Sequence, residues 1–324
     1  MLMVEAVKPI HVPVMRARIV EVLAPALARP GAVYLDGTLG LAGHASAILD
    51  RCPNARLIGI DRDSAALDQA AERLAGYGDR VRLYHAAYHE LPQVLDEDRT
   101  NTVDAICLDL GLSSLQIDTT ERGFAYAADA PLDMRMDTDQ ELTAADLVNT
   151  ASAGELTRWL REYGDEQFAD RIARRIVTVR AEQPILTSPQ LVGVVTDAIP
   201  AAARHARSGH PAKRTFQALR IAVNAELDSL AAVLPAALDA LAPGGRIAVL
   251  AYHSGEDRLV KRQFAQACTD RVPPGLPAVP EALKARFRPL TRGAERPSDE
   301  EVAANPRAAS ARLRAMARLE EVAA

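Results

Sequence analysis

The segment at residues 36–44, with the sequence DGTLGLAGH, decides the fold of this chain. It follows a short apolar run at residues 32–35 that predicts a buried strand, and residues 45–49 after it have the pattern of a helix. A glycine-bearing loop between a strand and a helix lets the backbone approach a bound ligand closely. The segment therefore predicts the first strand, loop and helix of an α/β ligand-binding domain.

The same alternation continues on both sides of this loop. Upstream, apolar residues recur at helical spacing over residues 16–28. Downstream, short apolar runs predict further strands at residues 57–60, 81–84 and 103–108. A helix is expected over residues 65–74, with Ser64 as its N-cap. Strands that alternate with helices indicate a parallel sheet with helices on its faces, and the predicted fold class is α/β.

The rhythm changes after about Gln116. A polar stretch precedes a region of helical periodicity, with helices expected near residues 143–150, 154–163, 168–180 and 189–198. A further helical pattern covers residues 213–241, a strand at residues 246–252 resumes the sheet, and one late helix is expected at 308–321. We therefore expect a helical domain, residues 119–209, inserted into an α/β domain made of residues 1–118 and 210–324.

Composition excludes several classes of protein. The 324 residues are 48% hydrophobic, and 38 Lys and Arg against 43 Asp and Glu leave a formal charge of −5, so no global cationic field indicates a nucleic-acid partner. Three separated cysteines without a CxxC pair exclude a disulfide framework, and no residue spacing marks a metal site. Residues 1–15 lack signal-peptide features, and no window approaches the ~18 apolar residues of a membrane span. A cytoplasmic protein without a membrane segment or a metal is expected.

Three glycines and one acid indicate the cofactor. Gly37, Gly40 and Gly43 lie in the first loop. Asp61 ends the second predicted strand, where a carboxylate can accept hydrogen bonds from both hydroxyls of a ribose. The dinucleotide fingerprint requires glycine at position 38, which is Thr38 here, so the pattern favours S-adenosylmethionine over NAD. An ordinary tight turn, and a helix-capping role for Asp61, are the alternatives.

Polar residues at two other predicted strand ends are candidates for catalysis. Asp109 follows the fourth strand, at the edge where an open α/β sheet binds ligands. Methyl transfer to an amine requires an acceptor that orients the N–H and then takes a proton. Asp109, Ser113 and Ser114 could provide such bonds, and His253 could serve the base pocket or a proton route. Helix capping by the serines and a structural role for the histidine are the alternatives.

A stretch without acids between Asp197 and Glu226 indicates a polynucleotide-binding surface. Its basic residues are Arg204, Arg207, Lys213, Arg214 and Arg220. They can follow phosphates although the whole chain is acidic, and an ordinary solvated face is the alternative. Arg135 is a further candidate for RNA contact, unless Asp133 or Asp137 holds it in an intramolecular ion pair.

Several long motifs, in order along nearly the whole chain, resemble one family. They lie at residues 11–14 (HVPV), 36–44, 59–63 (GIDRD), 109–118, 122–124, 131–137 (PLDMRMD), 210–226, 241–261 and 305–314. The chain resembles the bacterial small-subunit ribosomal RNA cytosine-N(4) methyltransferases, the MraW family. The resemblance implies a Rossmann-like class I S-adenosylmethionine-dependent methyltransferase with an inserted all-α domain. Its substrate would be the exocyclic amine of a cytidine in the decoding region of small-subunit RNA. We expect the assembled small subunit as the partner, although the sequence leaves free RNA open as the alternative.

The resemblance also implies the residues of the site. The cofactor contacts would be Ala42, Gly43, His44, Asp61, Tyr88, Asp109 and Gln116, and Tyr88 would stack on the adenine. The predicted catalytic residues are Asp109 and Ser114, and the predicted RNA contacts are Arg135, Lys213, Arg214 and His253. The chain departs from the family at Ala42 (usually Gly), Leu115 (usually Pro) and Gly255 (usually Leu). A positive φ at Ala42 would strain the loop.

Three other functions stay open on the residues alone. One is a nicotinamide dehydrogenase on a similar sheet. Another is a non-catalytic RNA-binding or ribosome-assembly factor, in which the three departures are lesions. The last is a methyltransferase of DNA cytosine or of a protein amine, because only the resemblance identifies the polynucleotide. The oligomeric state also stays open.

Overall fold

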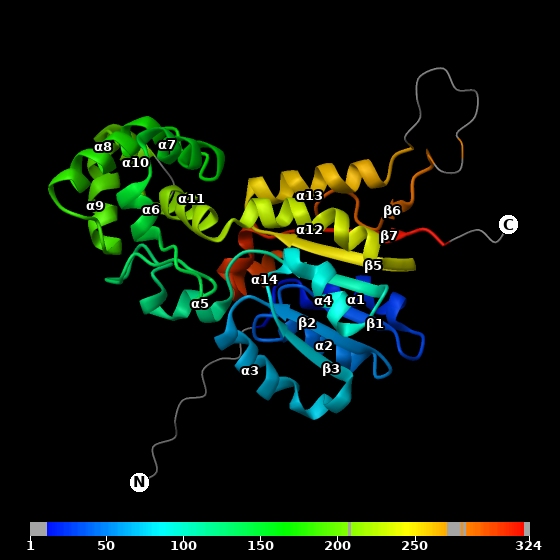
Figure 1. Cartoon of the computed structure of the whole chain (residues 1–324). Helices are drawn as coiled ribbons and strands as arrows, with labels where there is room; N and C mark the ends of the chain where they lie inside the picture. The colour runs from blue at the N-terminus through cyan, green and yellow to red at the C-terminus, as the bar shows by residue number, and fades with distance from the viewer. Residues whose placement is uncertain (1–11, 207–208, 271–279, 281–282, 321–324) are drawn as a thin grey trace, which may run out of the picture.

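A seven-stranded sheet forms the centre of the protein (Figure 1). The computed structural model describes residues 12–206, 209–270, 280 and 283–320. The strands are β1 (Val33–Asp36), β2 (Arg56–Asp61), β3 (Val81–His85), β4 (Val103–Asp109), β5 (Leu241–Ala251), β6 (Phe287–Pro289) and β7 (Arg312–Arg318). Their order is β3-β2-β1-β4-β5-β7-β6, in which β1 to β5 run parallel and β7 is antiparallel to both neighbours. The predicted α/β class is confirmed as a Rossmann-like sheet extended at one edge by two antiparallel strands.

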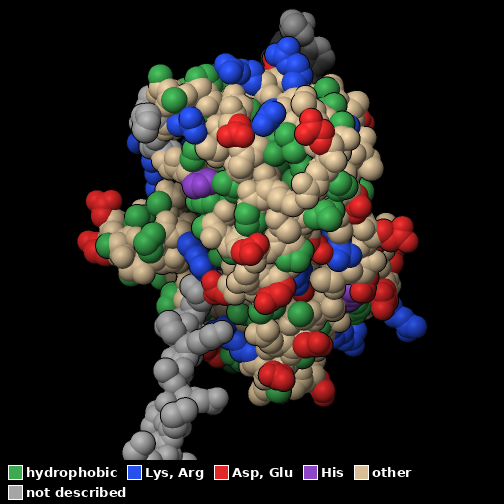
Figure 2. Space-filling view, turned by 90° about the vertical axis from the view of Figure 1, so that its left-hand side faces the viewer, with side chains coloured by type: hydrophobic (Ala, Val, Ile, Leu, Met, Phe, Trp, Pro, Cys, Tyr) green, Lys and Arg blue, Asp and Glu red, His purple; other side chains and the backbone are tan. Residues whose placement is uncertain are grey.

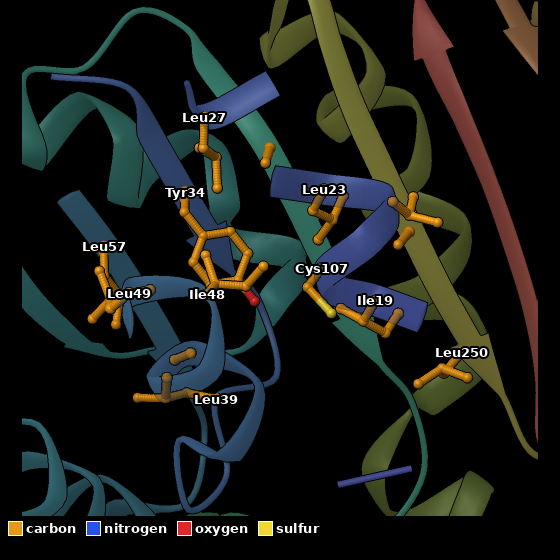
Figure 3. Packing of buried hydrophobic residues seen from close by; sticks show 14 of the residues in the cluster. Ile19, Leu23, Leu27, Tyr34, Leu39, Ile48, Leu49, Leu57, Cys107 and Leu250 are labelled. Atoms are coloured by element: carbon orange, nitrogen blue, oxygen red, sulfur yellow. The ribbon is translucent and has the colours of Figure 1, made fainter. Parts of the chain in front are cut away.

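Helices cover both faces of the sheet, because its central strands are buried on both sides. One face packs against α1 (Arg16–Leu23), the 3₁₀ turn η1 (Ala24–Leu27), α2 (Gly43–Arg51) and α3 (Ser64–Leu74). The other face packs against α4 (Leu91–Asp98), α12 (Glu226–Ala240) and α13 (Ser254–Ala267). In Figure 3, Ile19, Leu23 and Ile48 from the first layer surround Tyr34 and Cys107 of the sheet. Because β1 to β5 are parallel, their carboxyl ends lie at the same edge of the sheet, between the two helix layers.

Most helices between β4 and β5 build a separate core, drawn in green at the left of Figure 1. They are α6 (Ala144–Thr150), α7 (Ala153–Glu162), α8 (Ala169–Glu182), α9 (Ser188–Ala198), α10 (Ala201–Ala206) and α11 (Lys213–Asn224). The short elements α5 (Ser114–Asp118) and η4 (Thr120–Arg122) lead into them. The helices predicted between residues 143 and 198 are confirmed as α6 to α9. Phe216 and Leu219 of α11 are buried in this helical core, so we propose that the inserted domain extends to Ala225 rather than to residue 209.

One predicted helix is two helices. Ala225, with φ 48°, interrupts the pattern predicted at residues 213–241, and α11 and α12 meet there at a bend of 56°. Chain direction therefore changes at the point where the inserted domain returns to the sheet. None of the described helices is by itself long and apolar enough to cross a membrane. The bent pair α11 and α12 meets that length and composition only when the two helices are taken together.

The predicted late helix at residues 308–321 is wrong. Residues 306–310 form a 3₁₀ turn, η6 (Pro306–Ser310), after α14 (Asp299–Ala304), and residues 312–318 form strand β7. Leu313 and Ala315 are buried where β7 pairs with β5 and β6, so pairing within the sheet overrides the helix preference of Ala, Leu and Arg. A smaller correction concerns α3, whose N-cap position is occupied by Asp63 and not by Ser64.

Candidate active site

Two carboxylates hold the loop between β1 and α2. Asp36 Oδ1 accepts the N–H of Thr38 at 3.2 Å, and Asp61 Oδ2 accepts the N–H of Gly40 at 2.6 Å. The other Asp61 oxygen accepts the N–H of Asp63 at 2.9 Å, and burial raises the pKa of Asp61. Asp61 therefore ties the glycine loop to the end of β2 instead of capping α3. Each of its oxygens accepts one of these bonds, which leaves lone pairs for the hydroxyls of a ribose.

The loop reaches α2 in a strained conformation. Ala42 is fully buried at φ 57° and ψ 31°, the left-handed region that costs a residue other than glycine about 1–2 kcal/mol. Gly43 has no room for a side chain, because a Cβ there would lie 2.3 Å from Pro13 Cγ. His44 is 6% exposed, and its Nδ1 has no hydrogen-bond partner among the described residues. A buried nitrogen without a partner beside a tight loop fits a polar ligand such as S-adenosylmethionine.

Asp109 ends β4 at the centre of the same edge. Its Oδ1 accepts the hydroxyl of Tyr252 at 2.8 Å, and its Oδ2 lies 3.3 Å from His44 Nε2. Its backbone N–H donates to Thr38 Oγ1 at 2.6 Å. The Asp109 side chain keeps 24% of its surface exposed, whereas Asp36 is buried and burial raises the pKa of Asp36 to about 6. Of these two carboxylates, Asp109 is the one that an incoming substrate can reach.

Ser113 and Gln116 form a capping box at the start of α5. For Ser113, the structure therefore shows the alternative named above, helix capping. Ser113 Oγ accepts the N–H of Gln116 at 3.2 Å, and Gln116 Oε1 accepts the N–H of Ser113 at 3.1 Å. Gln116 Nε2 also donates to Asp63 Oδ2 at 3.0 Å, so both ends of its buried side chain have protein partners. The Ser114 side chain lies outside the described residues, and its catalytic role stays a prediction.

Tyr88 lies beside the glycine loop, in the 3₁₀ turn η3 (Tyr88–Glu90) that follows β3. A Cβ added to Gly37 would lie 3.5 Å from Tyr88 Cβ, and the Tyr88 hydroxyl donates to the carbonyl oxygen of Glu226 at 3.0 Å. The ring also packs partly against the core, and burial raises the pKa of Tyr88. Its location is consistent with a contact to the adenine, which stays a prediction.

His253 is the N-cap of α13 and faces buried charges. Its Nδ1 accepts the N–H of Gly255 at 3.2 Å, and its Nε2 lies 3.2 Å from Glu256 Oε1. Although burial acts in the opposite direction, His253 and Arg220 lower the pKa of Glu256. Two groups of side chains lie close enough to hold a metal ion, namely Glu226, His253 and Glu256, and His85, Asp137 and Asp139. Sequence spacing did not indicate either group, because each one joins a residue to two others that lie far away in the sequence.

Two of the predicted RNA-binding residues lie near this edge. Lys213 and Arg214 are exposed at the start of α11, and Arg214 donates to the carbonyl oxygen of Asp165 at 2.6 Å. Asp165 Oδ2 in turn accepts the hydroxyl of Ser254 at 2.9 Å. The start of α11 therefore lies beside the start of α13, next to His253.

Other basic residues are engaged within the protein. The phosphate contact predicted for Arg220 is wrong, because its guanidinium, with the side chain only 15% exposed, donates twice to the Glu226 carboxylate, each time at 2.8 Å. Arg135 donates to the Asp133 carboxylate and to two backbone carbonyls, so the alternative to an RNA contact, an intramolecular ion pair with Asp133, is formed. Arg207 lies outside the described residues. Figure 2 shows Lys and Arg side chains interspersed with Asp and Glu over one face of the molecule.

The sequence pattern missed Tyr252, Thr38 and Asp36, which form the inner contacts of the site. Asp36 and Thr38 lie in the loop that the sequence singled out, but their side chains were assigned no role. Tyr252 directly follows β5, the strand paired with β4, and its place at the carboxyl end of that strand was the available signal.

The sheet order, the glycine loop with its acid after β2, and the reachable carboxylate after β4 together define the methyltransferase class of Rossmann-like enzymes. Comparison with known sequences specifies the family. The chain matches the MraW methylase family over residues 8–319 and belongs to this family of S-adenosylmethionine-dependent methyltransferases. The predicted cofactor is thereby confirmed.

Individual relatives are similar over nearly their whole length. A protein from Cutibacterium acnes named ribosomal RNA small subunit methyltransferase H is 59% identical, over 96% of this chain and 92% of its own. A protein of the same name from Thermobifida fusca is 58% identical, over 97% and 94%. Among solved structures, an rRNA methylase from Streptococcus thermophilus is 12% identical with a TM-score of 0.41, and the match covers 94% of each chain.

Proposed function

We propose that this enzyme transfers the methyl group of S-adenosylmethionine to the exocyclic N(4) amine of a cytidine in the decoding region of small-subunit ribosomal RNA. The observation that carries the proposal is the Asp109 carboxylate, which accepts the Tyr252 hydroxyl and lies beside His44 at the open edge of the sheet. Similarity to the ribosomal RNA small subunit methyltransferases of Cutibacterium acnes and Thermobifida fusca supports the choice of polynucleotide.

The chain's own residues would perform three tasks. Asp61 and the glycine loop would hold the cofactor, which supplies an activated methyl group when bound. Asp109 would orient the amine through one N–H and take the proton that the nitrogen loses as it gains the methyl group. Lys213 and Arg214 would contact phosphates beside the site, because the target base must leave its stack to reach the sheet edge.

The test is transfer of radiolabelled methyl from S-adenosylmethionine to small ribosomal subunits, and to their free RNA, from a strain that lacks the modification. We expect label in N(4)-methylcytidine with the wild type and none with Asp109→Asn, which should still fold and bind S-adenosylmethionine. Asp50→Asn is the matched control, because exposed Asp50 also accepts a tyrosine hydroxyl, from Tyr77 at 2.7 Å.

Three results would contradict the proposal. Label at another atom or in another polymer would refute the substrate, and full turnover by Asp109→Asn would refute the role of that carboxylate. Binding of both S-adenosylmethionine and RNA by a wild type that transfers no methyl would instead support the non-catalytic assembly factor.

A further inference from the structure

We propose that Tyr252 is a positioning residue for methyl transfer, whose hydroxyl holds the Asp109 carboxylate in the orientation that receives the amine. The inference rests on the proposed function and adds a residue to its machinery. Its basis is the hydrogen bond of 2.8 Å from the Tyr252 hydroxyl to Asp109 Oδ1, formed between residues 143 positions apart in the sequence.

Tyr252 is itself fixed at two points, one on its backbone and one on its ring. Its backbone N–H donates to Glu256 Oε2 at 2.7 Å, which anchors the residue to the first turn of α13. Its ring covers Gly111, where an added Cβ would lie 3.3 Å from Tyr252 Cδ2. Gly111 has φ 97°, a conformation that favours glycine, so the loop after Asp109 is shaped to accept this ring.

The backbone beneath the pair is equally constrained. Asp109 lies opposite Leu250 in the β4–β5 ladder, and the N–H of Leu110 donates to the carbonyl oxygen of Leu250 at 3.0 Å. The carboxylate is therefore carried by the last residue of β4 and the hydroxyl by the residue directly after β5, and the register of these neighbouring strands does not shift at this point. Because both backbones are fixed, the hydrogen bond from the Tyr252 hydroxyl favours one rotamer of the Asp109 carboxylate.

Without the hydroxyl, the ion pair or hydrogen-bond partner left to the carboxylate among the described side chains would be His44, whose Nε2 lies 3.3 Å from Oδ2. It could then rotate, and part of the productive geometry would have to be regained during the reaction. Burial, and secondarily the charge of Asp109, raises the pKa of Tyr252 well above 10, so the hydroxyl stays protonated and able to donate at physiological pH.

The test compares Tyr252→Phe with wild type and with Tyr77→Phe, which removes a hydroxyl from the exposed pair with Asp50. Measured are kcat and KM for the RNA, the dissociation constant of S-adenosylmethionine by equilibrium dialysis, and the melting temperature. For Tyr252→Phe we expect kcat to fall about tenfold to a hundredfold, the effect of one hydrogen bond to a charged group. KM, the dissociation constant and the melting temperature should stay near wild type, and Tyr77→Phe should match wild type in all four.

A second variant covers the case in which Tyr252→Phe does not fold. Tyr252→His restores a ring N–H donor at the same strand end and should retain more of kcat than a variant without a donor, Tyr252→Leu. A folded Tyr252→Phe with wild-type kcat would overturn the inference. So would a loss of kcat explained by weaker S-adenosylmethionine binding, or equal kcat for the His and Leu variants.

The outcomes separate this inference from the proposed function. If wild type methylates a different amine, the proposed function fails, and the ratio of kcat between Tyr252→Phe and wild type on that amine still decides the role of Tyr252. If wild type methylates the cytidine and Tyr252→Phe does so equally well, only the positioning role fails. A wild type that transfers methyl to no acceptor overturns both.

Discussion

Replacing Asp36 by Asn should stabilise the protein at neutral pH. The Asp36 side chain is buried, and burial raises its pKa from the ordinary 3.8 to about 6. An acid whose pKa is raised in the folded state is protonated more readily there than in the unfolded chain, so its ionisation opposes folding. That cost is absent below the unfolded pKa of 3.8, grows as the pH rises, and is complete above about pH 6.

The magnitude follows from this interval. About two pH units at 1.36 kcal/mol per unit amount to a cost of about 3 kcal/mol at pH 7. Asn removes the charge and can keep both local contacts, because its oxygen can still accept the N–H of Thr38. Its amide can donate to the Tyr34 hydroxyl, which in the wild type donates to Asp36 Oδ2 at 2.9 Å.

The measurement is urea denaturation of wild type, Asp36→Asn and Asp50→Asn between about pH 4 and pH 8. The free energy of unfolding of Asp36→Asn minus that of wild type should increase by about 2.5 kcal/mol between pH 4 and pH 7 and then level off. Exposed Asp50 should show no comparable change. A difference for Asp36→Asn that is the same at every pH would refute the reasoning, because it would mean that Asp36 titrates alike in both states.

Four further variants test the packing and the RNA surface. Arg220→Met should lower the free energy of unfolding by about 3–5 kcal/mol, since it leaves a buried carboxylate unpaired, and a loss below about 1 kcal/mol in urea denaturation would contradict this. Ala225→Gly should raise the free energy of unfolding by about 0.5–1 kcal/mol, because it relieves the strain of an exposed alanine at φ 48°. Ala42→Gly should raise the free energy of unfolding by less than Ala225→Gly does, because it also removes a buried methyl group worth about 0.8 kcal/mol. Equal increases for the two variants in urea denaturation would refute this comparison. Removing both Lys213 and Arg214 by alanine should reduce the slope of log binding constant against log salt, measured with single-stranded RNA, by about 1.4, and an unchanged slope would exclude both from phosphate contact.

The parallel part of the sheet could be predicted because strands buried on both faces are continuous apolar runs ended by turns. The antiparallel strand β7 could not, since its sequence, RLRAMAR, consists of residues that favour helices. Only its position between β5 and β6 makes it a strand. The break at Ala225 was equally hidden, because no glycine or proline marks it and the surrounding packing imposes its left-handed backbone.

The candidate site could be predicted where chain topology alone brings residues together. Asp61 and Asp109 end parallel strands and His253 lies just after another, so the order of the sheet places all three at one edge. Contacts that depend on the direction of a side chain could not be predicted. Arg220 has the spacing of a surface cation but turns inward to Glu226, and burial of its guanidinium has no signature in the sequence.

The three departures from the family pattern, Ala42, Leu115 and Gly255, affect residues around the site, whereas the central carboxylate, Asp109, is in place. This argues against a non-catalytic role for this chain. Ala42 keeps the left-handed backbone that a glycine would adopt, at a cost in strain. Leu115 lies within α5, whose capping box remains formed. The N–H of Gly255 donates to His253 Nδ1, and a Cβ there would lie 3.0 Å from His253 Cε1, so leucine would press on that ring. None of the three contacts Asp109 by a hydrogen bond, and we therefore expect them to alter the rate of methyl transfer rather than abolish it.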